Sequence, residues 1–209
     1  MPLQNRVAPN GELCAVPARG MFMGNRGGRI HDPETQKLTG RTHASRRWIC
    51  CTTTYKDWHR DVWGKSYTEL FFFDEVTALA AGHRPCFLCR RDDARRFAEH
   101  WKTCEGLERA PSSDEMDLVL HGQRCGHKSS PCPLPLIDPR DDWPEGTLVQ
   151  DGERFIALKD QRWWSWSFDG YTPAATALPE RVSLVTPVQI IAILRDGYRP
   201  RWGPFHSSR

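Results

Sequence analysis

The sequence predicts an α+β protein built from two subregions, and three observations carry this prediction. An apolar run at 70–73, L-F-F-F, precedes a short helical pattern and a Cys-x-x-Cys motif at Cys86 and Cys89. From Trp143 onward, short β-type segments alternate with Asp-Gly and Lys-Asp turns. After these segments, the apolar residues at 187–196 recur at helical spacing. We expect a zinc-knuckle half with a short antiparallel sheet and helices, then a small β-meander or partial barrel with a C-terminal helix.

Composition limits the classes of function. The chain has 209 residues, of which 39% are hydrophobic, and its net charge is only +3. The hydrophobic content is sufficient for a core. Because the net charge is small, contact with nucleic acid requires local clustering of the basic residues. The sequence has no apolar leader and no run long enough to span a membrane, so we expect a cytoplasmic protein with reduced cysteines.

The distribution of residue types along the chain predicts a division into three segments. Residues 1–19 contain Pro, Gly and Asn without a period, which predicts a mobile arm. Residues 20–108 are expected to form the zinc-knuckle subdomain, and residues 109–209 the β-meander subdomain with its C-terminal helix. Within the first subdomain, the Gly-rich, basic stretch 21–29 is interpreted as a surface loop, because it lacks the ending of a phosphate-binding loop.

The first subdomain is organised around two strands and a helix. The stretch 48–54, W-I-C-C-T-T-T, is rich in aromatic and β-branched residues, which favours a strand. It is expected to pair antiparallel with the apolar strand at 68–73. Asp74 is a helix cap, and Gly82 is a left-handed helix stop, so the pattern predicts a short helix over 74–82 that packs on this pair.

The cysteines indicate a metal site. Two residues between Cys86 and Cys89 let both thiolates converge on one ion. Adjacent residues of a strand face opposite sides, so only one of Cys50 and Cys51 can reach the same ion, and the other is buried as a small hydrophobe. A redox pair and two metal-free thiols are the alternatives to structural zinc.

The stretch 72–91 resembles the second half of the Ada-type zinc-binding module of bacterial DNA alkylation-repair proteins. It carries the Phe-rich strand, the Ala-rich helix and the sequence A-A-G-H-R-P-C-F-L-C-R-R. The rest of the chain resembles, less sharply, an uncharacterised bacterial protein family. The resemblance implies a zinc bound by four thiolates, and contact with DNA phosphates.

The chain departs from the Ada pattern before the Phe strand. The family has a spaced cysteine pair there, whereas this sequence has the adjacent Cys50 and Cys51 and then His59. The methyl-accepting chemistry is therefore not carried over. His59 lies nearest to the sequence position at which the Ada pattern has its last early ligand. The expected ligand set is therefore Cys51, His59, Cys86 and Cys89, with His83 in reserve.

The leading functional hypothesis is a zinc-stabilised nucleic-acid-binding protein in DNA repair or nucleic-acid processing, with DNA favoured over RNA. Its basis is the Ada-like stretch, its Arg-rich flank and the nine Trp residues, some of which could stack on bases. The expected phosphate contacts are Arg84, Arg90, Arg91, Arg95 and Arg96.

Two other classes of function remain. An enzyme acting on a nucleotide or another phosphorylated substrate would use Glu69, His121, Arg124 and Lys128, with the metal purely structural. In that case His121 is the general acid or base, between two fixed cations. A partner-binding protein would instead use the Trp-rich face of the β-meander. Convergence of the four candidate residues in one pocket would favour the enzyme.

Overall fold

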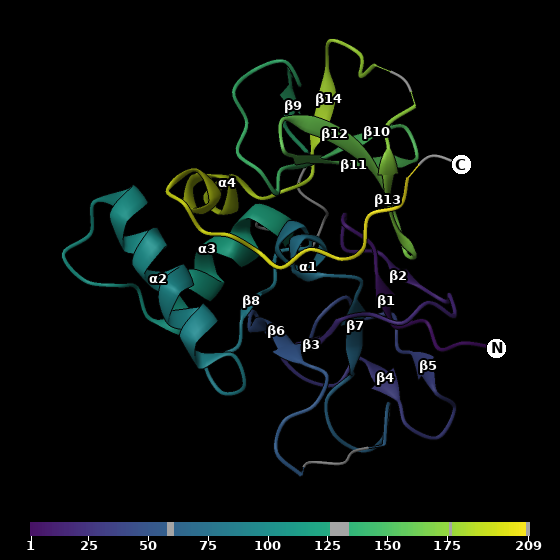
Figure 1. Cartoon of the computed structure of the whole chain (residues 1–209). Helices are drawn as coiled ribbons and strands as arrows, with labels where there is room; N and C mark the ends of the chain where they lie inside the picture. The colour runs from purple at the N-terminus through teal and green to yellow at the C-terminus, as the bar shows by residue number, and fades with distance from the viewer. Residues whose placement is uncertain (58–60, 126–133, 176, 208–209) are drawn as a thin grey trace.

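The computed structural model describes residues 1–57, 61–125, 134–175 and 177–207. Over these residues the chain forms two six-stranded sheets, a two-stranded sheet and four helices (Figure 1). The elements, in chain order, are β1 (Arg6–Val7), β2 (Leu13–Cys14), β3 (Phe22–Arg26), β4 (His31–Asp32), β5 (Lys37–Leu38), β6 (Trp48–Thr52), β7 (Leu70–Phe72), α1 (Glu75–Ala80), β8 (Arg84–Pro85), α2 (Arg91–Glu105), α3 (Ser113–Cys125), β9 (Leu136–Ile137), β10 (Leu148–Asp151), β11 (Arg154–Lys159), β12 (Arg162–Ser167), β13 (Gly170–Pro173), β14 (Val182–Leu184) and α4 (Val188–Arg195). The predicted α+β class is confirmed.

The first sheet has the strand order β2-β1-β7-β3-β6-β8. β3 pairs antiparallel with both β6 and β7 and therefore separates them. The prediction that the strands at 48–54 and 68–73 pair directly with each other is wrong. The strand between them, β3, comes from the stretch 21–29, whose composition predicts a surface loop.

Gly24 explains both the position of β3 and the wrong interpretation. A Cβ atom there would lie 2.1 Å from the carbonyl oxygen of Ile49 and 2.8 Å from the ring of Phe72. Only glycine lets the neighbouring strand and the Phe72 ring approach this closely. The glycines that permit the packing also weaken the strand pattern of the sequence, so the segment looks like a loop.

The N-terminal residues belong to the same sheet. β1 pairs parallel with β7, and the amide of Phe71 donates to the carbonyl oxygen of Asn5 at 2.8 Å. Val7 is fully buried in the core of this sheet. The expected mobile arm over 1–19 is therefore corrected: β1 lies between β2 and β7, β2 is the edge strand, and Val7 of β1 is part of the core.

The second sheet has the order β13-β12-β11-β10-β14-β9, and all its pairs are antiparallel. Strands β10 to β13 form the predicted meander. The sheet has β13 and β9 as its two edges and does not close into a barrel. The chain returns from β14 into α4, as the sequence predicts.

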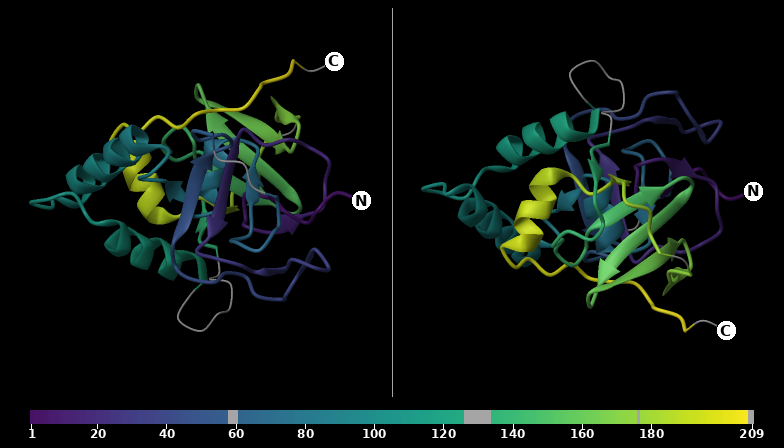
Figure 2. Two further views of the ribbon diagram at one scale, coloured as in Figure 1. Left: turned by 90° about the horizontal axis from the view of Figure 1, so that it is seen from below. Right: turned by 90° about the horizontal axis from the view of Figure 1, so that it is seen from above.

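The two predicted subdomains share their hydrophobic cores. One cluster joins Phe73 and Val76 of the first part to Leu148 and Tyr171 of the second. Another joins α1, α2, α3 and α4 across the expected boundary at residue 109. The three longer helices lie together on one side of the two sheets, whereas α1 lies between the sheets (Figures 1 and 2). The halves therefore fold against each other as one unit.

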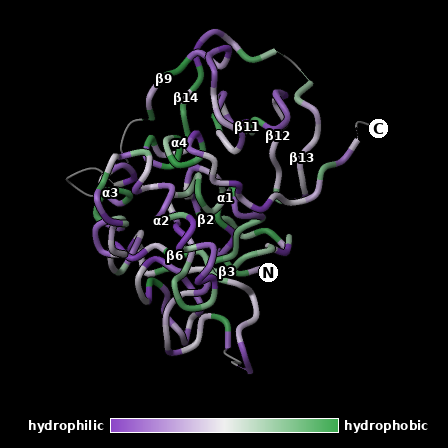
Figure 3. Tube along the Cα trace, turned by 60° about the vertical axis from the view of Figure 1, so that its left-hand side comes forward, coloured by the Kyte–Doolittle hydropathy of each residue, from purple (hydrophilic) through white to green (hydrophobic). Residues whose placement is uncertain are grey.

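The hydropathy of the chain follows this arrangement. Figure 3 shows hydrophobic and hydrophilic residues alternating along the helical part of the chain. In α2, Phe97 and Trp101 are buried, whereas Arg95 and Glu99 are exposed. No helix of the described residues is long and apolar enough to cross a membrane.

The role assigned to Gly24 is tested by Gly24→Ala. The added methyl group would collide with backbone atoms of β6, so we expect a loss of about 2–3 kcal/mol in the free energy of unfolding, measured by urea denaturation. Gly122→Ala is the matched control, because nothing lies near Gly122 on α3. It should change stability by no more than about 1 kcal/mol, toward greater stability. Equal effects at both positions would contradict the packing argument.

Candidate metal centre

Three cysteines converge on one point, one from β6 and two from the turn between β8 and α2. The sulfur atoms of Cys51, Cys86 and Cys89 all lie within 4.8 Å of one another. Cys51 and Cys86 are buried, and Cys89 is partly exposed. Three thiols at this spacing can bind a soft or borderline metal ion such as zinc. Three of the four predicted metal ligands are therefore brought together.

Local backbone geometry positions these sulfurs. Cys86 follows β8, and its amide donates to the carbonyl oxygen of Cys50 at 3.0 Å, which fixes it beside β6. The amide of Arg90 donates to the carbonyl oxygen of Cys86 at 3.0 Å and closes the knuckle. The amide of Leu88 donates to the Cys86 sulfur at 3.4 Å. These bonds aim Cys86 and Cys89 at the same point as Cys51.

Successive side chains of β6 point to opposite faces of the sheet, which places Cys50 and Cys51 in different surroundings. Cys51 faces the knuckle, whereas Cys50 is fully buried in the hydrophobic core of the sheet. The prediction that only one of the pair reaches the site is confirmed. Cys50 is more than a small hydrophobe, because its sulfur accepts a hydrogen bond from Arg90 at 3.2 Å. Burial raises the pKa of the Cys50 thiol, so it stays protonated.

The three clustered thiols differ in their pKa values. The pKa of Cys86 is lowered, because the Cys51 and Cys89 thiols donate hydrogen bonds to its sulfur and the backbone amides of the knuckle add to them. The pKa of Cys51 is raised by its hydrogen bonds to Cys86 and Cys89, and further by burial. Crowded thiolates repel each other, and a divalent cation removes this repulsion.

The two histidines predicted as a fourth ligand are His59 and, in reserve, His83. His59 lies outside the described residues. The reserve ligand, His83, lies at a different place: it is fully buried, with its ring 5.0 Å from Trp48 and 4.6 Å from Phe72. Its Nε2 accepts a hydrogen bond from Arg26 at 3.4 Å. His83 is thus part of an aromatic and basic cluster, with Trp48, Phe72 and Arg26, that no local sequence pattern indicates.

Two of the arginines expected to contact phosphate are instead buried in ion pairs. Arg84 binds Asp117 through two parallel contacts of 2.8 Å each. Arg90 contacts Glu75 at 2.6 Å and Asp93 at 2.7 Å. Buried guanidinium groups with carboxylate partners cannot reach a nucleic-acid backbone. Their role is structural, because each bridges segments that are distant in the sequence.

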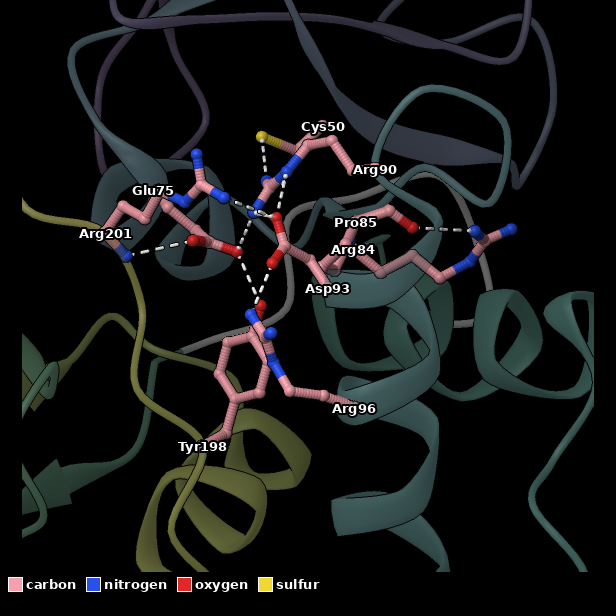
Figure 4. Close-up of polar contacts among 9 residues, drawn as sticks. All are labelled: Cys50, Glu75, Arg84, Pro85, Arg90, Asp93, Arg96, Tyr198 and Arg201. Atoms are coloured by element: carbon pink, nitrogen blue, oxygen red, sulfur yellow. Dashed lines mark hydrogen bonds and ion pairs between the residues drawn. The ribbon is translucent and has the colours of Figure 1, made fainter.

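Figure 4 shows how Arg90 connects the knuckle to the rest of the fold. Glu75, which accepts its hydrogen bond, also accepts from the hydroxyl of Tyr198 at 2.7 Å and from the amide of Arg201 at 2.9 Å. Asp93 is further paired with Arg96 and Arg201. The carboxylates of α1 and α2 therefore bind the C-terminal segment and the arginine beside the metal site.

The remaining arginines of α2 are accessible. Arg91 and Arg95 are exposed, and the side chain of Arg96 is exposed although it pairs with Asp93. They lie in the first two turns of the helix that begins directly after the knuckle. Leu88, inside the knuckle, is also exposed (58%). These residues form an accessible surface beside the cysteines.

Glu69 and His121, two of the four residues of the enzyme hypothesis, lie in different surroundings. Glu69 is buried and accepts from the amide of Trp63 at 2.9 Å. His121 instead packs against the ring of His43, with ring centroids 4.7 Å apart. Glu69 and His121 share no hydrogen bond, ion pair or ring contact in the described part of the chain. Arg124 lies against Gly82, and Lys128 lies outside the described residues.

Comparisons with protein-family models, with curated proteins and with solved structures find no match to this chain. The similarity to the Ada-type module therefore rests on the stretch 72–91 alone and stays a prediction. The three-cysteine cluster is independent of that similarity, because it is read from the positions of the sulfur atoms.

The metal centre is tested by substitution of its central ligand. Cys86→Ser removes one of three clustered thiolates, so the purified protein should lose most of its zinc and melt at a lower temperature. Elemental analysis and thermal denaturation measure both effects. Cys104→Ser is the control, because Cys104 lies on α2 and its sulfur contacts Trp101 and Gln189. Zinc content equal to wild type in Cys86→Ser would rule out this centre.

The buried ion pairs generate a second prediction. Glu75→Ala leaves Arg90 without its closest partner in a buried site, so we expect a loss of about 3–5 kcal/mol in the free energy of unfolding. Glu99→Ala on the exposed face of α2 is the control and should cost less than about 0.5 kcal/mol. Urea denaturation of both variants gives the comparison. A small effect of Glu75→Ala would show that the network is dispensable.

Proposed function

We propose that this protein is a zinc-stabilised nucleic-acid-binding protein of the cytoplasm. The observation that carries the proposal is the three-cysteine cluster directly before a helix that exposes Arg91 and Arg95. In this arrangement the metal fixes the knuckle, and the knuckle sets the direction of the helix. The exposed guanidinium groups then contact phosphates, which supply most of the affinity for nucleic acid. Zinc is favoured as the metal because thiolates are its usual structural ligands.

A hollow next to the cluster supports the proposal. It has a volume of about 520 Å³ and is lined by Cys86 and by the aromatic side chains of Tyr67 and Phe87, with Arg47 and Asn25 at the same hollow. Aromatic faces stack on bases, and arginine and asparagine contact phosphates and base edges. A single-stranded segment would find both kinds of partner there, beside the metal site.

The phosphate contacts are tested with the double variant Arg91→Ala/Arg95→Ala. Wild-type protein should bind labelled single-stranded and duplex DNA in fluorescence anisotropy, with affinity that falls as salt rises. Loss of two phosphate contacts should weaken binding to all sequences alike and flatten the salt slope for duplex DNA by about 1.8, at roughly 0.9 per contact. RNA of the same sequences shows which nucleic acid is preferred.

Arg162→Ala is the matched control, because it removes an exposed arginine from the second sheet. Its affinity and salt slope should equal those of wild type. Absence of binding at low salt by the zinc-loaded wild-type protein would refute the proposed function. Equal slopes for the double variant and wild type would refute the assigned contacts.

A further inference from the structure

A second cavity lies away from the cysteines, between the N-terminal segment, the first sheet and the second sheet. Its volume is about 520 Å³, within the range of small-molecule sites. Arg26 of β3, Arg41 of the loop after β5 and Arg124 of α3 line it, and Glu12 is the carboxylate among its lining residues. Three guanidinium groups with one carboxylate leave the described lining with net positive charge, which favours an anionic ligand.

Arg26 is held in place by groups of several segments. Its guanidinium lies 4.2 Å from the centre of the Trp48 ring. Its Nε donates to Nε2 of His83 at 3.4 Å, and its Nη2 donates to the carbonyl oxygen of Gly11 at 2.6 Å. A side chain fixed in this way loses little conformational entropy when a ligand arrives.

The imidazoles around this arginine are kept neutral. Burial, followed by the nearby Arg26 and Arg124, lowers the pKa of His83 well below its ordinary value. Burial and Arg26 likewise lower the pKa of His43. Neutral rings are required here, because additional cations would repel the arginines. The surroundings therefore retain the guanidinium groups as the positive charges that face the cavity.

The rest of the lining suits an organic group instead of a bare inorganic anion. Leu13, Leu38 and Leu134 supply apolar walls, and Gln4 and Gln150 supply amides. Apolar walls accommodate a planar heterocycle. The Nε2 atoms of Gln4 and Gln150 donate to the carbonyl oxygens of Leu13 and Gly152, so the amide oxygens are the groups offered to donors on the edge of the heterocycle. The cavity thus has one part for a charged group and another for a planar, hydrogen-bonding group.

We propose that this cavity binds a nucleoside monophosphate, with its phosphate at Arg26, Arg41 and Arg124 and its base between the leucines and the amides. Arg41 suits this role, because its side chain is exposed and the planar fork of an arginine forms two parallel hydrogen bonds to a phosphate. The nitrogens of Arg26 donate to His83, Thr42 and Gly11, so Arg26 contributes mainly its charge. The site goes beyond the proposed contact with nucleic acid, because it uses none of the exposed arginines of α2.

The experiment is isothermal titration calorimetry of the full-length, zinc-loaded protein with AMP, GMP, CMP and UMP. At least one should bind more tightly than its nucleoside and than inorganic phosphate. Arg41→Ala removes an exposed side chain and should preserve the fold, which thermal denaturation checks. It should weaken binding about tenfold or more, because a charged hydrogen-bond partner is lost. Arg162→Ala, outside the cavity, should bind like wild type.

Three outcomes would overturn the proposal: no binding of any of the four nucleotides, equal affinity for inorganic phosphate and for the nucleotides, or unchanged binding by Arg41→Ala. The double variant Arg91→Ala/Arg95→Ala separates this site from the proposed function. It should keep nucleotide binding while it loses affinity for DNA, so failure at one site is distinguished from failure at the other.

Discussion

The buried carboxylates of Asp74 and Glu75 connect the parts of this fold at the start of α1. Asp74 caps the helix by accepting from the amide and the hydroxyl of Thr77. Its other oxygen accepts from the hydroxyl of Tyr171 at 2.8 Å and from the amide of Gly203 at 2.9 Å. One helix cap therefore also binds the second sheet and the C-terminal segment. Removal of this carboxylate would leave donors unpaired in a dry interior, which is costly.

Glu75 extends the same constraint to the metal centre. It pairs with Arg90, which begins the turn into α2 and donates to Cys50 on the strand that carries Cys51. The geometry of the cysteines is thus supported from behind by an ion pair, which in turn is fixed by Tyr198 near the end of the chain. A metal site held in this way depends on the whole fold. Conversely, a bound metal would stabilise more than the knuckle.

Patterns of neighbouring residues in the sequence were sufficient to predict several features of the structure. The Asp74 cap and the left-handed Gly82 that ends the helix both occur as predicted, because capping involves only neighbouring residues. The convergence of Cys86 and Cys89 follows from their short spacing, and the assignment of Cys51 follows once that strand is known, because side chains alternate along it. The meander of the second half follows from alternating segments and turn residues.

Only the tertiary structure decided which arginines are available and how the first sheet is ordered. Arg84 and Arg90 have the same sequence character as Arg91, yet their carboxylate partners make them structural. The partner of Arg84, Asp117, lies 33 residues further along the chain, so no local pattern reveals the pair. The insertion of β3 depends on a close approach across Gly24, which a sequence does not display. The sequence alone determined the local geometry of the cysteine knuckle, because that geometry rests on neighbouring residues; the burial of charges and the order of strands were decided by contacts between distant ones.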